Sequence, residues 1–124
     1  MKILVVDDEH DMQTLFLQKF RKEIRDHAME FEFAFSGEEA LRYLNIHKHE
    51  AVLILSDINM PGMSGLELLR EIKQQFENPP PKVMMVTAYG DQENYTTAMR
   101  LGADDFLTKP LEFSLLKEKL KAIH

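Results

Sequence analysis

Two patterns of apolar residues take turns along the chain. Short apolar runs of the kind found in buried β-strands occur at residues 2–6, 31–35, 51–56, 82–87 and 105–108. After each run, apolar residues recur every three or four positions, which indicates amphipathic helices at about 10–26, 36–46, 64–76, 91–101 and 112–123. Five strand–helix pairs in succession predict an α/β fold with a parallel sheet.

Several helix ends carry their own signals. Ser36 with Glu39, and Ser64 with Glu67, have the spacing of a capping box, so a helix is expected to begin after each serine. Gly102 follows the expected helix at 91–101, where a glycine can take the left-handed conformation that ends a helix.

The patterns also predict the order of the strands. The runs at 2–6, 51–56 and 82–87 each contain a continuous apolar stretch, as in strands covered on both faces. The run at 31–35 alternates Phe with Glu, and the run at 105–108 is short, so both suit sheet edges. With right-handed crossovers, this favours the order 2-1-3-4-5 of a flavodoxin-like, doubly wound (βα)5 fold.

Composition narrows the class of protein. With 124 residues we expect one domain over residues 1–124, and the absence of cysteine excludes disulfides and thiolate metal sites. The apolar runs are too short to span a bilayer and no signal-peptide pattern opens the chain, so we expect a soluble cytoplasmic domain with no membrane contact. A net charge of -6 argues against direct binding of nucleic acid.

Polar residues that could bind a ligand or take part in a reaction lie at the carboxyl ends of the strands. Asp7 and Asp8 follow the first strand, Asp57 ends the third, Thr87 ends the fourth and Lys109 follows the fifth. Ligands of open parallel sheets bind at this edge, so we expect one site, with Asp57 as an exposed reactive group on a solvated rim. A single such Asp is ordinarily a turn residue, but the set of five favours a functional site. Three carboxylates against one lysine also predict a divalent cation, for which oxygen ligands suit Mg²⁺.

This set of groups suits phosphoryl transfer. A carboxylate can attack phosphorus and form an aspartyl phosphate. Lys109 and Mg²⁺ would neutralise the phosphoryl oxygens, and the Thr87 hydroxyl could donate a hydrogen bond to one of them. Neither glycine-rich nucleotide-binding pattern occurs, so a nucleotide is not the evident donor.

Four motifs together resemble one known family. "VVDDE", "SDINMPGMSG", "MVTA" and "FLTKP" have the order and spacing found in response-regulator receiver domains of two-component signalling, including the chemotaxis regulators. The resemblance implies that Asp57 accepts a phosphoryl group from a histidine kinase or phosphotransfer protein. It also implies a Mg²⁺ ion held by Asp8, Asp57 and the main-chain carbonyl of Asn59, with Asp7 acting through water.

The resemblance further assigns Lys109 to the phosphoryl group, and Thr87 with Phe106 to a conformational switch. Many relatives carry Tyr where this chain has Phe106, so the switch that the resemblance implies would have to work without that hydroxyl. A regulatory phosphoacceptor, rather than an enzyme with its own substrate, is therefore expected. Its downstream partner is undefined by the sequence, and a phosphorylation-dependent homodimer is compatible with the family.

Other interpretations stay open at this point. A Mg²⁺-dependent hydrolase with an aspartyl nucleophile usually presents D-x-D, whereas Asn59 stands at the third position here. A scaffold that keeps only the fold would not need the five polar groups together. The basic residues between 19 and 25 indicate a solvated helix face or a docking site for the kinase, and "HKH" at 47–49 suits a solvated helix end better than a metal site.

The last expectation concerns the bond between Lys109 and Pro110. Lys109 ends an edge strand and must turn its ammonium back toward Asp57, and an X–Pro bond makes the cis form accessible. We therefore expect this peptide bond to be cis, as the family resemblance also implies.

Overall fold

Five parallel strands form one sheet in the order β2-β1-β3-β4-β5. The computed structural model describes residues 1–47, 50, 53–76, 80–88 and 91–123. The strands are β1 (Lys2–Val6), β2 (Glu30–Ala34), β3 (Leu53–Asp57), β4 (Lys82–Ala88) and β5 (Asp105–Lys109). The predicted fold class and strand order are confirmed, with β2 and β5 at the edges. Residues 51 and 52 of the expected third strand, and Lys48 and His49 of "HKH", lie outside the described residues.

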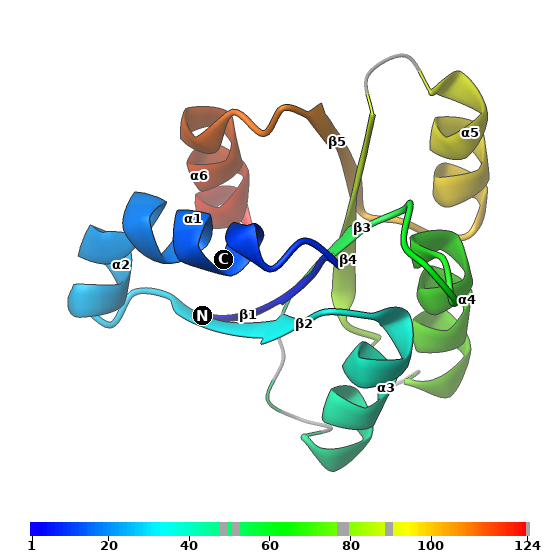
Figure 1. Cartoon of the computed structure of the whole chain (residues 1–124), viewed down its shortest axis with the longest axis horizontal. Coiled ribbons are helices and arrows are strands. Elements are labelled where there is room, and N and C mark those ends of the chain that lie inside the picture. The colour runs from blue at the N-terminus through cyan, green and yellow to red at the C-terminus, as the bar shows by residue number, and fades with distance from the viewer. Residues whose placement is uncertain (48–49, 51–52, 77–79, 89–90, 124) are drawn as a thin grey trace.

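Helices cover both faces of the sheet (Figure 1). They are α1 (Asp11–Lys19), α2 (Arg21–Arg25), α3 (Gly37–Ile46), α4 (Gly65–Gln75), α5 (Gln92–Arg100) and α6 (Phe113–Ala122). Figure 1 shows α1 and α6 on one face, and α3, α4 and α5 on the other. None of the described helices is both long enough and apolar enough to cross a bilayer.

The single helix expected over residues 10–26 is wrong. Phe20 has φ -107° and ψ 20°, which interrupts the helix between α1 and α2. The irregularity is local, since the Phe20 N–H still donates to the Phe16 carbonyl and the Ile24 N–H to the Phe20 carbonyl. The Phe20 ring is fully buried, and neither Gly nor Pro marks the break in the sequence.

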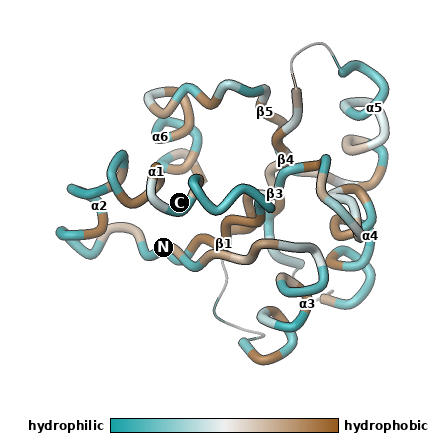
Figure 2. The backbone as a smooth tube through the Cα atoms, in the orientation of Figure 1, coloured by the Kyte–Doolittle hydropathy of each residue, from teal (hydrophilic) through white to brown (hydrophobic). Residues whose placement is uncertain are grey.

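Alternate strand residues build two cores, one on each face of the sheet. The core under α1 and α6 is rich in phenylalanine and includes Phe16 and Phe20, with Phe31, Phe33 and Phe113 packed against it. The core under α3, α4 and α5 is largely aliphatic. Figure 2 shows hydrophobic residues along the strands at the centre of the molecule. The strands β1, β3 and β4 are therefore packed on both faces, and this packing sets where their carboxyl ends lie.

The helix boundaries predicted at Ser36, Ser64 and Gly102 are confirmed. The Ser36 Oγ accepts a hydrogen bond from the Glu39 N–H at 3.0 Å, and the Ser64 Oγ accepts one from the Glu67 N–H at 3.2 Å. Gly102 has φ +99° after α5, as expected for a helix end. The Lys109–Pro110 bond is cis, which confirms that prediction.

Candidate functional site

Three carboxylates meet at the carboxyl edge of the sheet. Val6 of β1 pairs in register with Ser56 of β3, so Asp7 and Asp57 follow at the same level on neighbouring strands. Asp7, Asp8 and Asp57 each offer a carboxylate oxygen, and these oxygens lie within 4.8 Å of one another. The structure therefore brings together the acids that the sequence predicted to cluster.

The expectation of an exposed Asp57 on a solvated rim is wrong. Asp7 and Asp57 are each only 5% exposed, and Asp8 is half-buried. The sheet continues one residue past the acid, because the Ile58 N–H donates to the Val86 carbonyl at 3.0 Å. The side chain of Lys109 also contacts the Asp57 carboxylate, so protein groups take the place of water around it.

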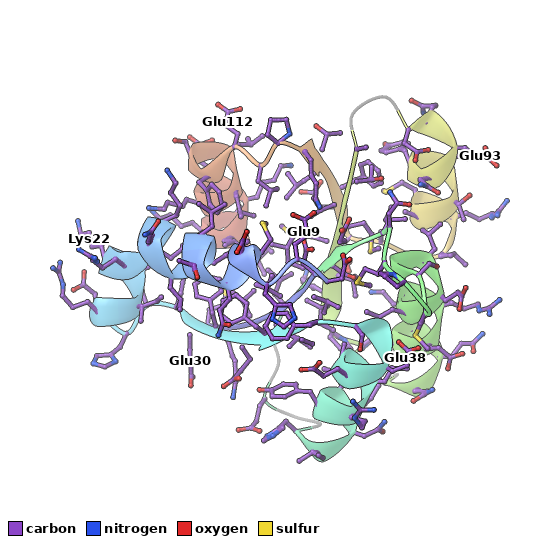
Figure 3. The ribbon with its side chains drawn as sticks, in the orientation of Figure 1. Glu9, Lys22, Glu30, Glu38, Glu93 and Glu112 are labelled. Carbon is purple, nitrogen blue, oxygen red and sulfur yellow. The ribbon has the colours of Figure 1, made fainter. Side chains whose placement is uncertain are left out.

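Lys109 connects the acids from the edge strand β5. Its Nζ donates a hydrogen bond to Asp57 Oδ2 at 3.1 Å and lies 3.6 Å from Asp7 Oδ2. It also lies 3.7 Å from Glu9 Oε1, a contact that the sequence analysis did not identify. The signal was available in "VVDDE", where Glu9 directly follows the two aspartates. Figure 3 labels Glu9 on the loop between β1 and α1.

Burial and charge act together on the protonation of these groups. Burial raises the pKa of Asp57 above its ordinary value, although the hydrogen bond and charge of Lys109 oppose this. Burial also raises the pKa of Asp7, while the Glu9 N–H, which donates to Asp7 Oδ1 at 2.9 Å, works against it. Burial acts to lower the pKa of Lys109, but the carboxylates of Asp57, Asp7 and Glu9 together outweigh it and the pKa is raised. Lys109 is therefore held as a cation. The two buried acids, in contrast, bind protons more readily than they would in water, because one lysine does not offset their burial.

A second residue absent from the sequence analysis is Gly65, at the start of α4. A Cβ at this position would lie 2.0 Å from the Asp57 carbonyl oxygen and 2.7 Å from the Ile58 Cα. The Gly65 N–H donates to the Ile58 carbonyl at 2.8 Å. Only glycine lets α4 approach the backbone of Asp57 this closely, so Gly65 fixes the turn "SDINMPGMSG".

The remaining predicted residues lie around the acids. Thr87 is 1% exposed and its Oγ1 has no hydrogen-bond partner among the described residues. It pairs with Thr108, next to Lys109. Phe106, near the start of β5, is half-buried. Its ring packs edge-on against the Tyr95 ring, with the centroids 5.0 Å apart and an interplanar angle of 82°. Asn59 is exposed on the loop that follows Asp57.

Comparison with known proteins points to one family. A family model described as the response regulator receiver domain matches residues 3–121. Response regulator RppA of Synechocystis is 34% identical over 123 residues, which are 99% of this chain and 50% of that protein. The chemotaxis protein CheY homolog of Campylobacter jejuni is 33% identical over 99% of this chain and 92% of its own.

The solved structures agree with this. A response regulator receiver domain protein of Clostridium thermocellum has a TM-score of 0.79 and 32% identity, over 98% of this chain and 92% of that one. The chain therefore matches some relatives along nearly their whole length, but it spans about half the length of others.

Proposed function

The chain belongs to the response regulator receiver domain family of two-component systems, and on that premise we propose that Asp57 accepts a phosphoryl group that switches the protein between two signalling states. The domain is a regulatory phosphoacceptor rather than a classical enzyme. The observation that carries the assignment to Asp57 is its contact with Lys109, at 3.1 Å, inside the cluster of three acids.

The reaction would use groups already in place. One Asp57 carboxylate oxygen attacks the phosphorus of a phosphohistidine and forms a P–O bond. The P–N bond breaks, its electron pair leaves with the imidazole nitrogen, and that nitrogen takes a proton from solvent. Lys109 stays protonated and stabilises the negative charge on the phosphoryl oxygens. The buried Thr87 hydroxyl, which has no partner among the described residues, would donate to one of those oxygens.

The acids fit a divalent cation. Their oxygens lie within 4.8 Å of one another and burial raises the pKa of two of the three acids, so the site favours added positive charge. We assign Mg²⁺, held by Asp8, Asp57 and the main-chain carbonyl of Asn59, with Asp7 acting through water. When bound, Mg²⁺ supplies positive charge that the phosphoryl oxygens need.

The signal would leave the site through Thr87 and Phe106. When the Thr87 hydroxyl turns toward a phosphoryl oxygen, the space beside it changes, and Phe106 can move in response. Because Phe106 packs against Tyr95, such a movement would alter the surface of α5.

The phosphoryl donor is a histidine kinase or phosphotransfer protein, and the basic face of α1 and α2 could dock it. The output partner, a phosphorylation-dependent homodimer and a cytoplasmic location are parts of the same proposal.

A hydrolase and a phosphorylation-silent scaffold are the competing functions. Incubation with acetyl phosphate and Mg²⁺, followed by intact-mass measurement, separates the three. We expect one labile phosphoryl group on the parent protein and none on Asp57→Asn. Rapid multiple turnover would identify a hydrolase, whereas no added mass would identify a scaffold. An Asp57→Asn variant phosphorylated like the parent would exclude Asp57 as the acceptor.

A further inference from the structure

We propose that Glu9 determines which phosphoryl donors the site accepts, by disfavouring small donors that carry two negative charges. The proposal deepens the proposed function and rests on it. Glu9 would act through its charge on the approaching donor, without touching the reacting phosphorus, so it is a specificity residue.

The geometry places Glu9 at the outer side of the site. Lys109 Nζ lies near three carboxylates, with Asp57 Oδ2 at 3.1 Å, Asp7 Oδ2 at 3.6 Å and Glu9 Oε1 at 3.7 Å. The Asp57 side chain is 5% exposed, whereas the Glu9 side chain is 65% exposed. Lys109 thus connects a buried acid with a solvent-facing one. The Glu9 backbone is also fixed, because its N–H donates to Asp7 Oδ1 at 2.9 Å.

The charges make this position consequential. Asp7, Asp8, Asp57 and Glu9 carry four formal negative charges against the single positive charge of Lys109. One divalent cation would still leave the group net negative. Glu9 is the member of this group on the solvent side, so its charge acts on an anion that approaches from solution. Since it is exposed, its effect on that anion is modest and depends on salt.

Two small donors provide a direct probe. Acetyl phosphate is mainly a dianion at neutral pH, whereas phosphoramidate is mainly a monoanion overall. Both transfer the same group: Asp57 attacks phosphorus, and the leaving acetate or ammonia departs with the electron pair of the broken bond. The nitrogen of the phosphoramidate monoanion is already protonated, so it leaves as neutral ammonia. The ratio of the two phosphorylation rates therefore reports the response to donor charge. Any general loss of Lys109 positioning affects both rates and cancels in the ratio.

The experiment measures this ratio for the parent, Glu9→Gln, Glu9→Asp and Glu93→Gln, each at saturating Mg²⁺. Glu93 is the matched control, because it is an exposed glutamate in the first turn of α5, away from the acid cluster. At about 0.01 M ionic strength, where the Debye length is about 30 Å, Glu9→Gln should raise the acetyl phosphate to phosphoramidate ratio about threefold. Glu9→Asp should keep most of the parent's preference, and Glu93→Gln should leave the ratio unchanged.

Salt gives a second, independent readout on the parent protein alone. At about 1 M ionic strength the Debye length falls to about 3 Å, so the ratio of the parent should rise toward that of Glu9→Gln. The proposal would be overturned by an unchanged ratio in Glu9→Gln, or by an equal rise of the ratio in Glu93→Gln. It would also be overturned if the difference in ratio between Glu9→Gln and the parent stayed the same at high salt. Failure of the parent to accept a phosphoryl group from either donor would instead reject the proposed function.

Discussion

Two aspartates at opposite ends of the sheet, Asp57 and Asp104, each meet a lysine at nearly the same distance. Asp57 Oδ2 lies 3.1 Å from Lys109 Nζ, and Asp104 Oδ2 lies 3.0 Å from Lys73 Nζ. Asp104 also accepts the Val83 N–H at 2.8 Å, and its side chain is 38% exposed. Asp57 is 5% exposed, and its lysine also lies near Asp7 and Glu9.

The difference lies in the balance of charge. At the Asp104 end, one lysine and one backbone N–H donate hydrogen bonds to one partly exposed acid. The backbone hydrogen bond connects β4 to the residue that precedes β5. At the Asp57 end, one lysine serves several acids, two of them buried and with raised pKa values. The same residue types thus stabilise the fold at one end and leave a demand for positive charge at the other. That demand is what a cation and a phosphoryl-transfer site use.

The largest predicted effect comes from two glycines at these two ends. Gly65→Ala should lower the free energy of unfolding by about 3 kcal/mol, because its Cβ would collide with the backbone of Asp57 and Ile58. Gly102→Ala should cost only about 1 kcal/mol, because its Cβ would lie 3.8 Å from the nearest Lys73 atom and the cost is mainly that of φ +99°. Urea denaturation measures both. Equal costs would show that α4 can move away from Asp57.

Magnesium should stabilise the Asp57 end specifically. At about ten times its dissociation constant, Mg²⁺ should add about 1.4 kcal/mol to the parent. Asp8→Ala should weaken binding more than Asp7→Ala, since Asp8 is assigned as a direct ligand. Asp104→Asn should respond like the parent. Thermal melting with increasing Mg²⁺ tests this, and parent-like binding by both Asp8→Ala and Asp7→Ala would place the ion elsewhere.

The two aspartates should respond oppositely to loss of charge. In a metal chelator, Asp57→Asn should raise the free energy of unfolding by about 1 kcal/mol, because it removes a buried charge that also repels Asp7. Asp104→Asn should lower it by about 1 kcal/mol, because Lys73 and Val83 lose their charged partner. Melting curves at pH 7 provide the comparison. A fall in both variants would contradict the charge-imbalance argument.

The smallest effect is in the pH dependence of stability without metal. The folded pKa values of Asp7 and Asp57 are raised above the unfolded value of about 3.9. The folded state therefore holds protons that the unfolded chain has released, so stability falls as pH rises from about 4 through the raised values. The fall should be smaller in Asp57→Asn than in the parent or Asp104→Asn. Identical curves of stability against pH for the parent and Asp57→Asn would mean that folding does not raise the pKa of Asp57.

The sequence was sufficient for most of the fold because its signals are local. Apolar runs identified the strands, and Ser36 and Ser64 marked the starts of α3 and α4. The interruption at Phe20 could not be foreseen, because no helix-breaking residue marks it in the sequence.

The site divides in the same way. Parallel strands must end together, so the meeting of Asp7, Asp8, Asp57 and Lys109 followed from strand order. Burial of Asp57 did not, since it depends on how Ile58 pairs with Val86 and where Lys109 lies. The tight approach of Gly65 depends on the packing of α4 against β3, which no local pattern records.

The most direct test of the central claim is to locate the phosphoryl group. Borohydride reduces an aspartyl phosphate to homoserine, so the protein would be treated with acetyl phosphate and Mg²⁺, reduced, digested and sequenced by mass spectrometry. The predicted result is homoserine at position 57 and unchanged aspartate at positions 7, 8 and 104. Homoserine at position 7 or 8, with Asp57 intact, would contradict the account.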